Sequence, residues 1–273
     1  MHTIDVQGRA VPALGYGTWQ LRGAACRDGV AHALSAGYRH VDTAQLYGNE
    51  EEVGQALAAA AVPRADVWVT TKLTREHLTP EAVRTSTVES LRRLGLDDVD
   101  LLLIHWPGGP VPLEDTLGAM ADLVADGLVG AVGVSNFPPS LVRAAQAVTP
   151  ILANQVEYHA YLSQDDLLDL ARATDHVLTA YSPLANGQLL TDPVLAAIAD
   201  AHGVGVAEVA LAWLLGQAHV AAIPKATAAA RIEANLAAAD LALSAEERAA
   251  IDALDRGPGG RVIDPPFAPD WER

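Results

Sequence analysis

The sequence predicts a single-domain α/β protein folded as a (β/α)8 barrel. Its 273 residues match the usual length of one such barrel. Half of the residues are hydrophobic, which is enough to bury a large core. Eight short segments rich in β-forming residues alternate with longer helical stretches, and no low-complexity linker separates them. We therefore expect residues 1–273 to form one domain.

The strands are identified by their composition. Several are continuous apolar runs, such as LLLI at 101–104, and such runs are typical of parallel strands covered on both faces. A β-hairpin is expected before them, at the N-terminus. The eight barrel strands are predicted at Leu14–Trp19, Arg39–Thr43, Val67–Lys72, Val99–His105, Val129–Ser135, Ala153–Glu157, Val177–Tyr181 and Val220–Pro224.

The helices are bounded by recognisable caps. Thr79 precedes Pro80, which is an N-cap followed by proline at the first helical position, and Gly95 ends that helix. Ser244 and Glu247 form the capping box of a C-terminal tail helix. The predicted helices are Arg27–Ala36, Glu51–Ala60, Pro80–Leu94, Leu113–Asp126, Pro138–Val148, Gln164–Ala173, Pro193–Ala201, Ala207–Gln217, Arg231–Ala239 and Ser244–Leu254.

A doubly wound Rossmann sheet is the competing fold. That fold places the motif G-x-G-x-x-G after its first strand. Here Gly15 and Gly17 are followed by Gln20, where the third glycine belongs. The sequence therefore favours the barrel.

Charge and lysine content exclude several classes of protein. The chain carries 34 acidic and 18 basic residues, a net charge of −16, and its only two lysines are Lys72 and Lys225. Neither lysine is followed by Ser or Thr, as a phosphate-binding P-loop requires. Neither has a tyrosine four residues before it, as short-chain dehydrogenases do. An acidic chain repels nucleic acid and anionic lipid, so neither partner is expected.

The lone cysteine and the N-terminus favour a cytoplasmic protein. Cys26 cannot form an internal disulfide, and the N-terminal residues lack the pattern of a signal peptide. The most apolar long stretch, Val204–Ile223, contains Glu208 and is closed by Pro224. We expect a buried helix running into a buried strand there, rather than a membrane span.

The carboxyl ends of the strands, where such barrels carry their active sites, hold many functional side chains. Asp42, Lys72 and His105 end the second, third and fourth strands, and Tyr47 lies in the loop after Asp42. A tyrosine phenol has an ordinary pKa of about 10, and a nearby ammonium is expected to lower that pKa. Asp42 would orient Lys72, while His105 would polarise the oxygen that receives the proton. The group suits reduction of a carbonyl by a hydride donor.

Other interpretations of these residues are a rim ion pair, a core histidine and a loop aromatic. Their joint placement on adjacent strand ends favours catalysis. No metal site is expected, because the chain has no H-E-x-x-H motif and no cysteine cluster. Two other functions stay open: a Schiff-base aldolase that uses Lys72 or Lys225, and a non-catalytic subunit that binds or senses a cofactor.

The motifs around these residues are similar to those of the aldo-keto reductase family, along nearly the whole chain. The similar runs are GYRHVDTAQLYGNE at 37–50, TTKL at 70–73, LIHWP at 103–107, GVSNF at 133–137, NQVEYH at 154–159, AYSPL at 180–184, IPKA at 223–226 and RIEANL at 231–236. The resemblance implies that Asp42, Tyr47, Lys72 and His105 are the catalytic tetrad. Tyr47 would then donate the proton and His105 would orient the carbonyl.

The resemblance also implies that NADPH binds in an extended pose across the barrel mouth. Ser135, Asn136 and Gln155 would hold the carboxamide of the nicotinamide, and Tyr181 would stack on its ring. Ser182 and Leu184 lie where the pyrophosphate would pass. The other implied contacts come from Thr18, Asp42 and Asn235, the last of these at the adenine.

Two cations are implied for the 2′-phosphate of this cofactor. Lys225 and Arg231 would bind it through charge-assisted hydrogen bonds. Many relatives have serine after this lysine, whereas this chain has Ala226. One hydrogen bond is therefore missing, or it is supplied by Thr227.

The substrate pocket is expected to be aromatic and open. Trp19 and Trp106 would line it together with Tyr47 and His105, and Trp271 would join them. The loop after His105 is short, and the ending GRVIDPPFAPDWER looks like that of small bacterial members that reduce 2,5-diketo-D-gluconate and methylglyoxal. We expect a small aldehyde or ketone as substrate and a monomeric protein.

Overall fold

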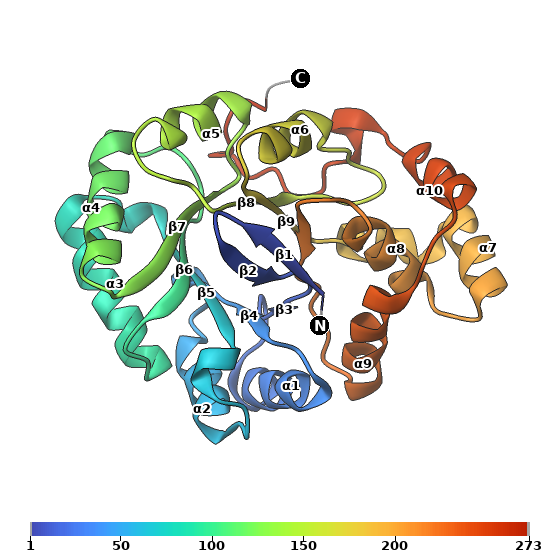
Figure 1. The fold of residues 1–273 in the computed structure, drawn as a ribbon, viewed down its shortest axis with the longest axis horizontal. Helices are drawn as coiled ribbons and strands as arrows, with labels where there is room; N and C mark the ends of the chain where they lie inside the picture. The colour runs from blue at the N-terminus through green and yellow to red at the C-terminus, as the bar shows by residue number, and fades with distance from the viewer. Residues whose placement is uncertain (1, 272–273) are drawn as a thin grey trace.

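The structure, a computed structural model that describes residues 2–271, confirms the barrel. Eight parallel strands follow one another around the sheet in chain order, and the helices form a ring outside them (Figure 1). The strands are β3 (Tyr16–Gly17), β4 (His40–Asp42), β5 (Trp68–Leu73), β6 (Val99–Ile104), β7 (Val129–Ser135), β8 (Ala153–Glu157), β9 (Val177–Tyr181) and β10 (Val220–Ala222).

Glycine lets the first and last barrel strands meet. Regular pairing of β3 with β4 covers only Tyr16 and Gly17, which is shorter than the predicted strand. On the other side, an isolated bridge from Leu14 to Ala222 joins this segment to β10. The amide of Gly17 also donates to the carbonyl of Pro224 at 3.0 Å. A Cβ on Gly17 would lie only 2.7 Å from the carbonyl oxygen of Ile223, so the close approach requires glycine.

The helices begin and end near the predicted residues. Thr79 Oγ1 accepts a hydrogen bond from the amide of Ala82 at the start of α3, and Ser244 caps α10 as predicted. The first helix begins at Gly23, earlier than predicted, because Ala24 and Ala25 are strong helix formers. The helices are α1 (Gly23–Ala36), α2 (Glu50–Ala59), α3 (Pro80–Leu94), α4 (Leu113–Ala125), α5 (Pro139–Gln146), α6 (Asp165–Ala173), α7 (Pro193–His202), α8 (Val206–Leu215), α9 (Ala229–Ala237) and α10 (Ala245–Asp252).

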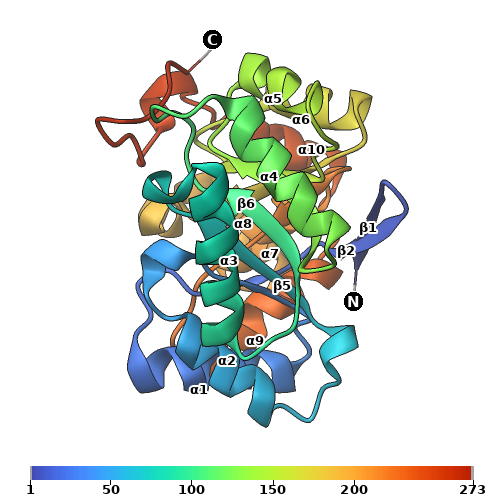
Figure 2. The ribbon, with the colours of Figure 1, turned by 90° about the vertical axis from the view of Figure 1, so that its left-hand side faces the viewer.

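The predicted N-terminal hairpin covers the amino end of the barrel. Its strands β1 (Thr3–Val6) and β2 (Arg9–Pro12) are joined by Gln7 and Gly8, which both have positive φ, as a type I′ turn requires. Gln7 Nε2 donates to the carbonyls of Ile151 and Asp175, just before β8 and β9. The hairpin and the C-terminal segment lie at opposite ends of the molecule (Figure 2).

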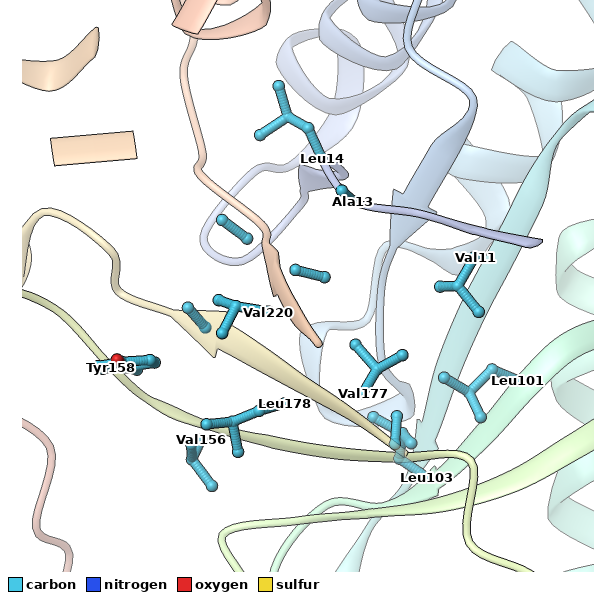
Figure 3. Packing of buried hydrophobic residues seen from close by; sticks show 14 of the residues in the cluster. Val11, Ala13, Leu14, Leu101, Leu103, Val156, Tyr158, Val177, Leu178 and Val220 are labelled. Carbon is cyan, nitrogen blue, oxygen red and sulfur yellow. The ribbon is translucent and has the colours of Figure 1, made fainter. Parts of the chain in front are cut away.

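One apolar core joins the hairpin, the barrel and the helices. Figure 3 shows Leu101, Leu178 and Val220 of the barrel gathered together with Val11 of β2. Helix α8 is buried along residues 209–215, which accounts for the long apolar stretch in the sequence. Within residues 2–271, no single helix has the length and apolar character to cross a membrane; α7 and α8 have both together, but they meet at a bend of 93°.

Candidate active site

Four predicted catalytic side chains meet at the carboxyl ends of neighbouring strands. Asp42 ends β4, Lys72 is the last residue but one of β5, and His105 directly follows β6. Tyr47 comes from a short 3-10 turn, Gln45–Tyr47, above β4. The structure therefore brings these residues together as their strand positions predict.

Lys72 is fully buried and uses all three of its N–H groups. Its Nζ lies 2.5 Å from Asp42 Oδ1, 2.8 Å from the carbonyl of Thr43 and 3.4 Å from Tyr47 Oη. The second carboxylate oxygen of Asp42 accepts from Gln155 Nε2 at 2.7 Å. Burial lowers the pKa of Lys72, and the charge of Asp42 opposes this shift. Hydrogen bonds thus satisfy both partners, as a buried ion pair requires.

The expectation for the pKa of Tyr47 is wrong in direction. Burial raises the pKa of Tyr47 well above its ordinary value, and the carboxylate of Asp42 raises it further. Lys72 does not reverse this shift, because its ammonium lies closer to Asp42 than to Tyr47 and is balanced there. The phenol therefore keeps its proton at neutral pH.

The ring of Tyr47 packs edge-on against His105, with the ring centroids 5.6 Å apart. Burial, followed by the charge of Lys72, lowers the pKa of His105 to about 3. The imidazole is therefore neutral at physiological pH. Its Nδ1 is buried without a hydrogen-bond partner in the part of the chain that the structure describes.

Buried polar side chains extend the site along the ends of β7, β8 and β9. Asn136 Nδ2 donates to the carbonyl of His105 at 3.0 Å, and Asn136 Oδ1 accepts from Tyr181 Oη at 2.7 Å. Ser135 Oγ donates to the carbonyl of Gln155 at 2.7 Å. Since Gln155 also donates to Asp42, the residues predicted to hold the nicotinamide are bonded to the tetrad.

The other predicted cofactor residues differ in burial. Thr18 is buried and its Oγ1 donates to the carbonyl of Asp42 at 2.9 Å. Asn235 of α9 is also buried. Lys225 and Arg231 are exposed, and neither forms an ion pair with a carboxylate within residues 2–271. Of the remaining three, Ser182 and Leu184 are half-buried and Thr227 is exposed.

The tryptophans at the mouth lie in two groups. Trp19 is 45% exposed and faces Tyr47, with ring centroids 6.4 Å apart. Trp106 is buried and packs edge-on against Phe267 at 5.5 Å and Trp271 at 6.4 Å between centroids. Sequence reasoning did not find Phe267, because it lies in a segment after the last helix where no periodicity fixes its place.

A buried carboxylate holds this C-terminal segment. Glu157, at the end of β8, is fully buried. Its Oε1 accepts from the amide of Val262 at 2.7 Å and its Oε2 from the amide of Ile263 at 2.9 Å, while His159 Nε2 lies 2.8 Å from Oε1. The sequence places Glu157 only at the end of a strand. The structure shows that its carboxylate binds the backbone of the C-terminal segment.

Known proteins resemble this chain along nearly its whole length. The model of the Aldo/keto reductase family matches residues 13–256. The chain is 40% identical over 268 residues to methylglyoxal reductase DkgB of Salmonella typhi, with 96% of this chain and 99% of that one covered. It is 38% identical over 256 residues to an aldo-keto reductase of Mycobacterium sp. strain KMS, with 92% and 91% covered.

Solved structures agree with these relatives. A crystal structure described as a "putative 2,5-diketo-D-gluconic acid reductase B" matches with a TM-score of 0.98 at 43% identity, covering 100% of this chain and 98% of that one. The aldose reductase of Schistosoma japonicum matches with a TM-score of 0.88 at 35% identity, covering 94% and 93%. This chain therefore belongs to the aldo/keto reductase family. It is an oxidoreductase of carbonyl and alcohol groups, in a family that uses NAD(P)H.

Proposed function

We propose that this protein reduces small aldehydes and ketones with NADPH, and that Tyr47 donates the proton. The state of Tyr47 carries the proposal. Its Oη receives a hydrogen bond from Lys72, and no acceptor within residues 2–271 takes its proton. A phenol whose pKa is raised by burial keeps that proton until a stronger base is near. A carbonyl oxygen that gains negative charge during reduction is such a base.

The neighbouring residues support this proton transfer. Lys72, held by Asp42 and Thr43, stabilises the phenolate as the proton leaves Tyr47. Neutral His105 offers a ring N–H to the same carbonyl oxygen and so orients it. When bound, the reduced nicotinamide supplies a hydride to the carbonyl carbon. The alcohol then carries the proton of Tyr47.

The residues at the ends of β7 and β8 fit a nicotinamide carboxamide. Gln155 commits its Nε2 to Asp42, and no hydrogen bond in the described chain engages its Oε1. That oxygen, together with Asn136 Oδ1 and Ser135 Oγ, offers acceptors for an amide N–H. Burial raises the pKa of Tyr181, so its ring is a neutral phenol suited to stacking. Thr18, Ser182 and Leu184 would line the path of the cofactor.

Preference for NADPH over NADH is assigned to Lys225 and Arg231. Both cations are exposed, and no carboxylate within residues 2–271 competes for either. A phosphate between them would receive charge-assisted hydrogen bonds. Thr227 is exposed and would supply the hydroxyl that Ala226 lacks. Asn235 would contact the adenine.

An aldolase mechanism is less well supported. A Schiff base needs a free amine, but all three N–H groups of Lys72 are engaged and its charge is paired with Asp42. Lys225 is exposed and stands outside the tetrad. A subunit that only binds a cofactor would leave the arrangement of Tyr47, Lys72 and Asp42 without a purpose.

Methylglyoxal is the first substrate to test, because the similar protein of Salmonella typhi is a methylglyoxal reductase. We propose that the protein works in the cytoplasm, where its single cysteine, Cys26, stays buried and reduced. We also propose that it works as a monomer, the common state of relatives of this size.

Oxidation of NADPH, followed by its absorbance with methylglyoxal, diketogluconate and aromatic aldehydes, tests this function. Tyr47→Phe keeps the ring but removes the proton, so kcat should fall by at least about 100-fold. The Kd for NADPH, measured by fluorescence titration, should change by less than about twofold. Full activity in Tyr47→Phe would contradict the role of Tyr47, and a protein that binds NADPH but reduces no carbonyl would contradict the function.

A further inference from the structure

We propose that Arg75 and Arg261 form a two-arginine anion site at the barrel mouth, and that the preferred substrates are carbonyl compounds that carry a carboxylate. The proposal rests on the proposed reductase function and specifies its substrate class.

Both arginines lie over aromatic rings of the C-terminal segment. Arg75 Cζ is 4.6 Å from the ring centroid of Phe267, and Arg261 Cζ is 3.7 Å from that of Trp271. Both rings pack on Trp106, the residue after His105. Each guanidinium is therefore one ring away from Trp106, near the place where the carbonyl is expected to bind.

Neither guanidinium has a carboxylate partner. The structure records no ion pair for Arg75 or Arg261 within residues 2–271, and the N–H groups at Arg75 Nε and Arg261 Nη1 are buried without an acceptor there. The other half-buried arginines have acceptors: Arg64 contacts Asp100 at 2.9 Å, Arg93 contacts Glu50 at 2.6 Å, and Arg39 donates to two backbone carbonyls. Buried polar groups nearly always have partners, so the missing partner at the mouth points to a ligand.

The acidic groups that face Arg261 are already committed. These groups are Glu157 and Asp264. Glu157 accepts from two backbone amides, and Asp264 Oδ1 accepts from Trp271 Nε1 at 3.0 Å. Their negative charges weaken the positive potential around Arg261, but neither carboxylate forms an ion pair with its guanidinium within residues 2–271. Burial lowers the pKa of Arg261, but a guanidinium keeps its proton in proteins, and its planar N–H groups match a carboxylate.

The backbone fixes Arg261 in place. On one side, Gly260 packs so closely on the carbonyl of Tyr161 that any side chain would overlap with it. On the other side, Glu157 binds the amides of Val262 and Ile263. A cation positioned in this way needs little ordering when a ligand binds. On a chain of net charge −16, such local positive charge is what an anionic substrate requires.

The test compares two aldehydes of similar shape, succinic semialdehyde and its neutral methyl ester, with NADPH. The wild-type kcat/KM for the acid should exceed that for the ester by about tenfold, and added salt should reduce this ratio. In Arg75→Gln and in Arg261→Gln, the acid-to-ester ratio should fall by about tenfold, mainly through KM for the acid. Arg92→Gln removes the same charge from the far end of α3 and should leave the ratio unchanged.

A structural role for the stacked arginines would give a different result. Arg261→Lys keeps the charge but loses the planar stacking, so it should retain more of the acid preference than Arg261→Gln does. If Arg261→Lys and Arg261→Gln lost the acid preference equally, or if kcat/KM fell in parallel for the acid and the ester, the arginines would only fasten the C-terminal segment. Equal use of acid and ester by the wild type would refute the anion site and leave the reductase function standing. Reduction of neither probe, nor of any carbonyl in the wider panel, would contradict the function itself.

Discussion

In the proposed mechanism, Lys72 acts on the product of proton transfer rather than on the resting phenol. Its charge is balanced by Asp42 while Tyr47 is neutral, and burial keeps the pKa of Tyr47 raised. Once the proton leaves, the phenolate lies 3.4 Å from an ammonium that is already in place. Preorganised charge of this kind stabilises a transition state without moving any group. A buried ion pair can thus serve an acid catalyst that is fully protonated at rest.

Lys225 and Arg231 should decide which nicotinamide cofactor binds. A hydrogen bond to a charged group contributes roughly 1.5–3 kcal/mol, so Lys225→Ala or Arg231→Ala should raise the Kd for NADPH by about ten- to hundredfold. NADH lacks the 2′-phosphate and is the internal control, because its Kd should change little. Fluorescence titration of both cofactors measures the difference. An equal weakening of both would overturn this assignment.

Among the structural elements, the segment after α10 depends on one buried carboxylate. Glu157 accepts from the amides of Val262 and Ile263 on its two oxygens, and Phe267 and Trp271 follow a few residues later. Glu157→Gln keeps the shape but replaces one acceptor oxygen by an NH2 group, which cannot accept. Loss of a bond to a charged group should speed amide exchange at Val262 or Ile263 by about tenfold or more.

Hydrogen exchange of the whole chain supplies the control for Glu157→Gln. Amides inside the barrel, such as that of Leu102 in β6, should exchange at the wild-type rate if the effect is confined to the tail. Unchanged exchange at residues 262 and 263 would mean that packing on Trp106, rather than Glu157, holds the segment.

The strand ends explain how much of the site was predictable from the sequence. A residue at the carboxyl end of a parallel strand must lie at the barrel mouth, so Asp42, Lys72 and His105 were placed together by strand position alone. The direction of the pKa shift of Tyr47 was not predictable, because it depends on burial and on whether Lys72 lies nearer to Asp42 or to Tyr47. Arg75 lies in a single 3-10 turn, Arg75–His77, and Phe267 lies in an irregular segment, and the positions of both follow from tertiary packing rather than from periodicity.

Across the whole molecule, charge is distributed unevenly. The chain has a net charge of −16, yet Arg75, Arg261, Lys225 and Arg231 all follow strands or segments at the carboxyl end of the barrel. Anionic cofactors and substrates would be repelled by the molecule as a whole and attracted at this end. The excess of acidic residues therefore does not conflict with an anionic ligand.

The stability of the whole molecule should fall in mild acid because of its buried histidines. Burial lowers the pKa of His105 to about 3 and that of His176 to about 4, and it also lowers the pKa of His40. Between these values and the ordinary pKa of about 6.5, the unfolded chain binds protons that the folded chain does not. The free energy of unfolding should therefore rise with pH across this range, by up to about 1.4 kcal/mol per pH unit for each such histidine. Urea unfolding at several pH values from neutral to about 4.5 measures this slope.

His176→Asn tests the contribution of one buried histidine. The asparagine keeps an acceptor near the position of Nδ1 but cannot bind the proton, so the slope of unfolding free energy against pH should decrease by about one histidine's share. A slope that stays the same in His176→Asn would show that groups other than this histidine set the acid sensitivity.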